Sequence, residues 1–180
     1  MNALYSRMNS TQRQCEIVAM ACYAYILCVL TLFSSVLASQ ETLKNIAHSF
    51  LKVLDECKQE LNLHENILLD LYHFWKEDYG LLKRDTGCAI MCMSQKLQLV
   101  DTTGNLHHGN AQEFAVKHGA EVEVAQKLVN MVHECEKQHQ VQEDPCERAL
   151  EVAKCFRGGI HLLKWNPTVE VLVEEVLTEV

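Results

Sequence analysis

Residues 86–92 read Thr-Gly-Cys-Ala-Ile-Met-Cys, and the two cysteines of this segment, Cys88 and Cys92, stand four positions apart. Helical spacing of the apolar residues predicts a helix from Asp85 to Leu97, which places both cysteines on one face in neighbouring turns. Side chains that point in the same direction are badly placed to bond to each other. Each cysteine is therefore expected to reach a different helix, so that one short helix is tied to two others.

The other cysteines predict a disulfide framework. The chain has nine cysteines, of which three fall in the first 38 residues and six follow: Cys57, Cys88, Cys92, Cys135, Cys146 and Cys155. An even set behind a secretory leader is typical of an oxidising compartment, although six cysteines by themselves allow 15 pairings. Zinc is the competing use, but no second close pair matches Cys88 and Cys92, so we expect no metal site and no cofactor.

The first 38 residues predict a signal peptide. Arg7 and Arg13 precede an almost wholly apolar segment, 17–30, and residues 36–38 suit cleavage after Ala38. The alternative is an uncleaved anchor, because residues 17–38 are long enough to span a bilayer. Cleavage is favoured because a polar, helical sequence begins at once with Ser39, and we expect a secreted, extracellular protein.

The charge of the remaining domain, residues 39–180, is strongly negative. Residues 1–38 hold two basic residues and one acidic residue, so their removal changes the net charge of the chain from −8 to −9. Nucleic acids and anionic membrane surfaces would repel such a protein. The sequence therefore disfavours both as partners and suits a protein that stays soluble at high concentration.

Residues 39–180 predict an all-α domain, because no segment alternates apolar and polar residues and nearly all follow helical spacing. Six helices are expected, over residues 43–61, 67–75, 85–97, 111–118, 122–135 and 145–159. Asn110 is predicted as the N-cap of the fourth helix, and Gly119 as its end. Asp144 is predicted to cap the sixth, with Pro145 at its first position and Gly158-Gly159 at its end.

One set of side chains on the inward faces is a candidate binding site. Its apolar and aromatic members are Phe50, Phe74, Trp75, Ile90, Phe114, Val129, Val132 and Phe156. Plain core packing is the simpler explanation for such a set, and the lining of an apolar pocket is the other. Ser94, one turn from Ile90, offers a hydroxyl to one ligand oxygen, or alternatively bonds a carbonyl of its own helix.

The C-terminal tail, residues 166–180, predicts a response to acid. It would carry one apolar stripe if helical. Its four acidic residues form like-charge pairs at four-residue spacing, which oppose the helix while ionised: Glu170, Glu174, Glu175 and Glu179. Acid would neutralise them, and the tail could then fold and enter an apolar cavity.

Histidines predict a second trigger, because their charge changes near pH 6.5. The adjacent pair His107 and His108, with His133 on a neighbouring helix, would gain like charges in acid and open a lid. The other histidines are expected to lie mostly on the solvated surface: His48, His64, His73, His118, His139 and His161.

The cysteine spacing and several longer strings resemble a known family. The gaps between successive cysteines of the six are 30, 3, 42, 10 and 8 residues. The strings are Ser39-Gln40-Glu41, Asp55-Glu56-Cys57-Lys58, Phe74-Trp75-Lys76-Glu77, residues 86–92, and Gly104-Asn105-Leu106-His107-His108-Gly109-Asn110. Together they resemble the lepidopteran pheromone-binding branch of the insect pheromone and general odorant-binding protein family, across residues 39–180.

The resemblance implies a six-helix, three-disulfide fold around an internal hydrophobic cavity. It implies the disulfide pairs Cys57–Cys92, Cys88–Cys146 and Cys135–Cys155. It also implies that the apolar and aromatic side chains named above line the cavity, and that the Ser94 hydroxyl contacts the head group of a long-chain alcohol, aldehyde or acetate. It also implies acid-triggered release through His107, His108, His133, Glu170 and Glu179.

The expected function is that of a secreted carrier, which takes a hydrophobic ligand through the sensillum lymph to olfactory receptors or the neuronal membrane. A general odorant-binding protein for plant volatiles and a secreted helical signalling protein without a cavity are the alternatives, and dimerisation is left open. An enzyme is disfavoured, because the sequence has neither a Gly-x-Ser-x-Gly elbow nor a strand to carry it.

Overall fold

The computed structural model describes residues 20–23, 25–26 and 40–165. The chain divides into two compact units, residues 1–37 and 38–180, and the fold below is that of the second. The described residues of the first unit are helical. The predicted cleavage site and the predicted switch tail lie outside the described residues. No described helix is long and apolar enough to cross a membrane.

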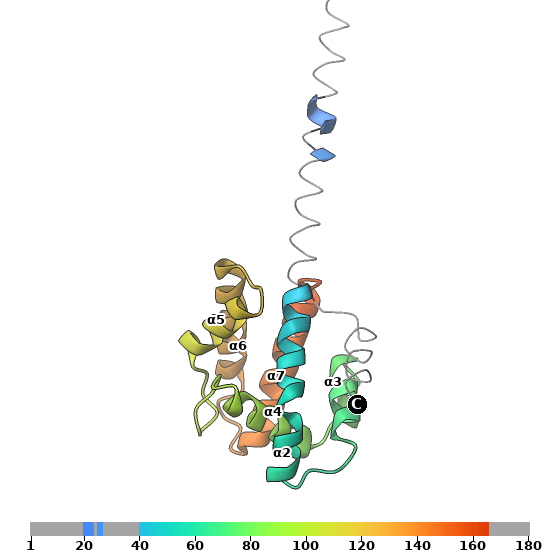
Figure 1. Ribbon diagram of the computed structural model, residues 1–180, viewed down its shortest axis with the longest axis vertical. Helices are drawn as coiled ribbons and strands as arrows, with labels where there is room; N and C mark the ends of the chain where they lie inside the picture. Colours follow the sequence, from blue (N-terminus) through green and yellow to red (C-terminus); the bar gives the residue numbers. More distant parts are fainter. Residues whose placement is uncertain (1–19, 24, 27–39, 166–180) are drawn as a thin grey trace, which may run out of the picture. The chain divides into compact units, whose positions relative to one another are not determined.

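The second unit is all-helical in its described part, which confirms the predicted class (Figure 1). Residues 40–52 are helical and are followed by α2 (Leu54–Glu60), α3 (Ile67–Trp75), η1 (Tyr79–Leu81), α4 (Arg84–Lys96), α5 (His108–Lys117), α6 (Val122–Gln138) and α7 (Pro145–Leu162). In the described residues the only strand-like pairing is an isolated bridge between Val100 and Leu106.

The arrangement of the helices is centred on the pair α4 and α7, which pack against each other. In Figure 1, α5 and α6 lie together on one side of this pair and α3 lies on the other. The pair is in very close contact at Gly87, where an added Cβ would lie 2.0 Å from the carbonyl oxygen of Cys146. Only a residue without a side chain fits between the two backbones there.

Three disulfides connect four of the helices in a series. Cys57 of α2 bonds to Cys92 of α4, Cys88 of α4 bonds to Cys146 of α7, and Cys155 of α7 bonds to Cys135 of α6. These are the pairs that the family resemblance implies. As expected from the spacing in residues 86–92, the two cysteines of α4 reach two different helices.

The core consists of two clusters. The first surrounds α4 and holds Leu54, Cys57, Ile67, Leu71, Ala89, Cys92 and Met93. The second lies among residues 40–52, α5, α6 and α7 and holds Leu43, Ala115, Ala120, Ala125, Leu128 and Ile160. Trp165 packs on the second cluster, with the ammonium of Lys127 5.0 Å from the centre of its ring.

The helix ends follow the predictions in part. The Asp144 carboxylate accepts hydrogen bonds from the N–H groups of Cys146 and Glu147 at 2.9 and 3.0 Å, and Pro145 is the first residue of α7, as predicted. Gly119, with φ of +100°, follows the end of α5.

Three predicted boundaries are wrong. The helix expected over 43–61 is interrupted at Val53, whose N–H donates to the Phe50 carbonyl three residues back. Asn110 is not an N-cap, because α5 begins at His108, and the Asn110 amide donates to the Gln98 carbonyl instead. Helix α7 continues through Gly158-Gly159 to Leu162.

Candidate ligand-binding site

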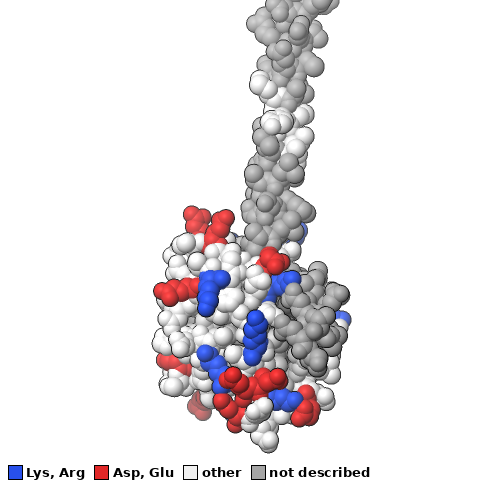
Figure 2. All heavy atoms as spheres, in the orientation of Figure 1, with Lys and Arg blue, Asp and Glu red and all other residues white. Residues whose placement is uncertain are grey.

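A cavity of about 990 Å³ lies within the second unit, bordered by residues of the helix over 40–52 and of α3, α4, α5, α6 and α7. Its lining is mainly aliphatic and aromatic. Charged groups of both signs lie on the outer surface of the described residues in Figure 2. Cavities that take small molecules measure about 300–1,000 Å³, so this one is at the large end of the range.

All nine residues predicted for the ligand site border this cavity: Phe50, Phe74, Trp75, Ile90, Ser94, Phe114, Val129, Val132 and Phe156. They come from the helix over 40–52 and from five further helices, so the fold gathers residues more than 100 positions apart. Two aromatic contacts organise the walls. The rings of Phe50 and Phe114 meet edge to face at 6.3 Å, and those of Phe74 and Trp75 at 5.6 Å.

Ser94 brings a hydroxyl to the apolar wall formed by α4. Its oxygen makes no hydrogen bond to the described part of the chain, and the alternative bond to a carbonyl one turn back is not formed there. A hydroxyl that faces an apolar cavity can bond to an oxygen or a hydroxyl on a bound molecule. The side chain is therefore placed to contact one polar group of a ligand.

Several lining residues were missed at the sequence level. Ile46, Met91, Leu99 and Leu106 also border the cavity. Ile46 precedes Phe50 by four residues, and this spacing could have identified it. Leu99 and Leu106 lie in or beside the loop between α4 and α5, where helical periodicity gives no signal.

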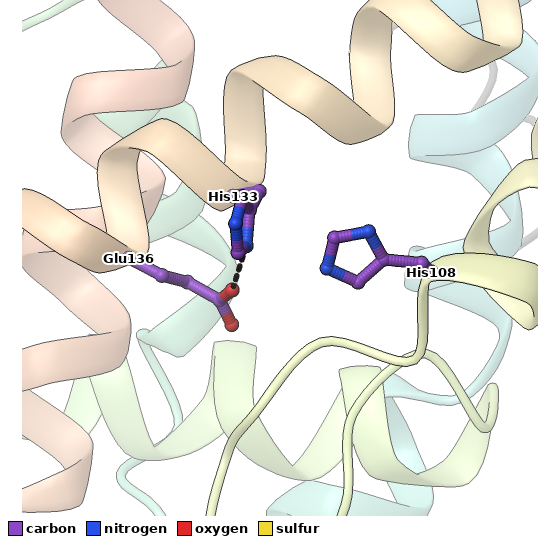
Figure 3. Close-up of side chains that lie close together, drawn as sticks. All are labelled: His108, His133 and Glu136. Carbon is purple, nitrogen blue, oxygen red and sulfur yellow. Dashed lines mark ion pairs between the residues drawn. The ribbon is translucent and has the colours of Figure 1, made fainter.

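Two of the three predicted trigger histidines meet at the edge of the cavity (Figure 3). The rings of His108 and His133 are 4.6 Å apart between centroids, and His133 Nδ1 lies 3.7 Å from Glu136 Oε2. The Leu106 N–H donates to Glu136 Oε1 at 2.8 Å. His107 is exposed and lies at the N-cap position of α5, outside the lining. Glu136 was missed, although it follows His133 by one helical turn.

The loop between α4 and α5 borders the cavity and is held by one carboxylate. Asp101 accepts hydrogen bonds from the hydroxyl and N–H of Thr103 at 2.7 and 2.8 Å and from the N–H of Asn105 at 2.9 Å. The Thr103 hydroxyl and then the Asn105 N–H hold the pKa of Asp101 well below its usual range. The Arg148 guanidinium donates to the Thr103 carbonyl and so ties this loop to α7.

His118 differs from the prediction of a solvated surface residue. It is half-buried, its Nε2 lies 2.6 Å from Ser49 Oγ, and its Nδ1 lies 2.7 Å from the Phe114 carbonyl oxygen. A carbonyl oxygen only accepts, so Nδ1 donates. His118 thus links α5 to the helix over 40–52.

The fold and the cavity define a small helical binding protein, crosslinked by disulfides, with an internal site for an apolar molecule. Residues 39–158 match the PBP/GOBP family, and the chain belongs to that family. Members of the family are binding proteins and not enzymes, and this chain is one of them.

Named relatives agree with this assignment. The chain is 49% identical over 151 residues to Pheromone-binding protein 2 of Epiphyas postvittana, covering 84% of this chain and 92% of the relative. It is 34% identical over 132 residues to General odorant-binding protein 2 of Heliothis virescens, covering 73% and 82%. It also resembles the crystal structure of Epiphyas postvittana Pheromone Binding Protein 3, with 64% identity, a TM-score of 0.59, and coverage of 62% of this chain and 96% of that one.

Proposed function

We propose that this protein is a secreted carrier of long-chain aliphatic alcohols, aldehydes or acetates. It would leave the cell after removal of residues 1–38 and carry its ligand through the sensillum lymph to olfactory receptors. The observation that carries the proposal is the apolar cavity of about 990 Å³, bordered by all nine residues of the predicted site. The relative named as a pheromone-binding protein, at 49% identity, supports the ligand class.

Burial of the ligand chain provides the affinity. Each methylene removed from water contributes about 0.8 kcal/mol, so a chain of roughly 12–16 carbons supplies on the order of 10 kcal/mol before the cost of association. One polar contact, to Ser94, is then sufficient for orientation. Selectivity between chains that differ by one methylene is expected to be modest.

The test is displacement of the fluorophore N-phenyl-1-naphthylamine by 1-hexadecanol and hexadecyl acetate. We expect one competable site per molecule. Val132→Trp places an indole in the cavity and should weaken binding of the fluorophore and of both ligands at least about tenfold. The matched control is Val141→Trp, because Val141 is 91% exposed, and it should bind as the parent protein does. Without competable binding the carrier proposal is wrong.

Ser94 is tested separately from the apolar walls. A hydrogen bond contributes about 0.5–1.5 kcal/mol, so Ser94→Ala should weaken binding of 1-hexadecanol roughly two- to tenfold. Hexadecane, which has no oxygen, should bind equally to both proteins. An equal loss for alcohol and alkane would assign Ser94 to packing and not to the head group.

We further propose that acid releases the ligand through residues 166–180. At neutral pH the glutamates, including Glu170 and Glu179, repel each other, and protonation removes this repulsion. The tail could then fold as an amphipathic helix and compete for the cavity. The full chain should lose affinity for N-phenyl-1-naphthylamine at pH 5, and a chain that ends at Trp165 should retain it. Equal acid sensitivity of the two proteins would reject the tail mechanism.

A second candidate is a carrier of plant volatiles. It is favoured by the 34% identity to General odorant-binding protein 2 of Heliothis virescens. The two candidates share the cavity and differ in the ligand. Mass spectrometry of ligand co-purified from native tissue would decide between a straight aliphatic chain and a compact volatile. The same sample would show whether the chain begins at Ser39.

A further inference from the structure

The side chains of His108, His133 and Glu136 form a compact group at the edge of the cavity. One nitrogen or oxygen from each of the three lies within 4.8 Å of those of the other two. His133 and Glu136 come from neighbouring turns of α6, and His108 is the first residue of α5. Figure 3 shows the His108 imidazole pointing across the gap toward the other two side chains.

We propose that this group binds one divalent transition-metal ion, with Zn²⁺ as the expected ion. Two imidazoles and one carboxylate are ligands that Zn²⁺ accepts in open sites, whereas Ca²⁺ and Mg²⁺ require oxygen ligands throughout. Nothing in the cysteine pattern indicates this site, because all three ligands come from outside the disulfide framework.

The distances are close to those that coordination requires. In a tetrahedral zinc site with bonds of about 2.0–2.2 Å, neighbouring ligand atoms are roughly 3.4 Å apart. His133 Nδ1 and Glu136 Oε2 are already 3.7 Å apart. His108 is exposed, so its ring can rotate by the remaining distance, on the order of 1 Å.

The surroundings hold the carboxylate in a suitable orientation. The Leu106 N–H donates to Glu136 Oε1, which leaves Oε2 facing His133. Carboxylates that bind metals are commonly oriented by such a second hydrogen bond. The neighbouring lysine does not compete, because Lys137 pairs with Glu134 at 2.8 Å.

The bound ion would connect α5 to α6 at the rim of the cavity. Three protein ligands leave one coordination position for water or for an oxygen of a bound molecule. The three ligand side chains line the same cavity as Ser94. The ion would thus crosslink α5 to α6, although α5 contains no cysteine.

Calorimetric titration of the oxidised full chain with ZnCl₂, after alkylation of free thiols, tests the proposal. Alkylation is needed because Cys22 is a free, exposed thiol. We expect one ion per molecule. His108→Gln and His133→Gln should each lower the affinity at least about tenfold, because even loss of an outer hydrogen-bond partner costs about 10–100-fold. The matched control is His139→Gln, at the C-terminal end of the same helix, which should bind Zn²⁺ as the parent does.

A second measurement does not depend on variants that must fold. In NMR spectra, substoichiometric Cu²⁺ should broaden the ring signals of His108 and His133 before that of His139. Absence of saturable Zn²⁺ binding, unchanged affinity in the His108→Gln and His133→Gln double variant, or equal broadening of all three rings would each overturn the proposal.

Discussion

Helices α2, α4, α7 and α6 are linked in series by disulfides, whereas α3 and α5 contain no cysteine and are held by weaker contacts. Thr86, fully buried in α4, donates its hydroxyl to Asp70 of α3 at 3.1 Å. Arg157 of α7, only 4% exposed, donates to the carbonyl of Trp75 at the end of α3. On the other side, α5 is held by the contacts of Asn110 and His118.

The comparison shows how a hollow protein remains stable. Missing core volume costs about 24 cal/mol per Å³, so a cavity needs compensation from elsewhere in the fold. The disulfides of α2, α4, α6 and α7 contribute to that compensation, whereas the walls formed by α3 and α5 are held by packing and hydrogen bonds. Local opening is expected first in elements that no covalent crosslink holds, so ligand should enter beside α3 or α5.

The largest expected effect is the loss of the disulfide between Cys88 and Cys146. This bond closes a loop of 58 residues, against 20 for Cys135–Cys155. A disulfide stabilises the fold by restricting the unfolded chain. Replacing Cys88 and Cys146 by serine should therefore lower the free energy of unfolding by about 4 kcal/mol, and replacing Cys135 and Cys155 by serine should lower it by about 3 kcal/mol. Urea unfolding measures both. If loss of the Cys135–Cys155 disulfide lowers the free energy of unfolding more than loss of Cys88–Cys146 does, loop length is not the source of the stability.

The close contact of α4 with α7 should be nearly as sensitive. Gly87→Ala would place a methyl group 2.0 Å from the Cys146 carbonyl oxygen, and we expect a loss of about 3 kcal/mol. Gly158→Ala is the matched control, because no atom beyond the neighbouring backbone of its own helix lies within 4 Å of the added methyl group. In that helix interior it should stabilise the protein by about 0.5–1 kcal/mol. Similar losses in both variants would contradict the steric explanation.

The attachment of α3 can be weakened selectively at Arg157. Its guanidinium pairs with Glu77 at 3.0 Å and donates to the Trp75 carbonyl at 2.8 Å. Arg157→Leu removes the donor to the Trp75 carbonyl and leaves Glu77 paired with His161 alone, and it should cost about 2 kcal/mol. Hydrogen exchange should accelerate more in α3 than in α2. Arg84→Leu, which removes an exposed pair with Asp144, should change the exchange of α3 little.

The smallest expected effect is a change in the pH dependence of stability through Asp101, which organises the loop before α5. Its pKa is depressed in the folded protein, so it stabilises the fold above the unfolded value of about 3.9. This contribution is lost as the pH falls below that value. Asp101→Asn should be less stable at pH 7 and lose less stability between pH 4 and pH 2, as measured by urea unfolding at each pH. A steeper acid loss in the variant would contradict the assignment.

The sequence predicted most of the helices and their inward faces because helical periodicity identifies such faces directly, but periodicity did not separate core packing from cavity lining. The aromatic positions, such as Phe50 and Phe114, follow from that rule together with the family resemblance. The start of α5 did not follow, since the bridge of Val100 with Leu106 and the bond from Leu106 to Glu136 are tertiary contacts. With these contacts in place, α5 begins at His108, two residues before Asn110.

Two further differences between the sequence-based predictions and the structure also involve tertiary contacts. Helix α7 continues through Gly159, and Met131 of α6 fills the space beside this glycine, where an added Cβ would lie 2.6 Å from the methionine methyl. His118 is half-buried because Ser49, 69 positions earlier, supplies a partner. Neither neighbour is visible in the local sequence, and both are fixed only when the helices pack.

The two tryptophans of the chain provide an optical readout that needs no label. Trp75 borders the cavity, while Trp165 packs at the end of the second core cluster and directly precedes residues 166–180. Emission from Trp75 should therefore shift to the blue when a hydrocarbon replaces solvent beside it, and emission from Trp165 should follow rearrangement of the chain end. Phenylalanine substitution of one indole at a time would separate the two signals, so that filling and emptying of the protein could be timed in a stopped-flow instrument.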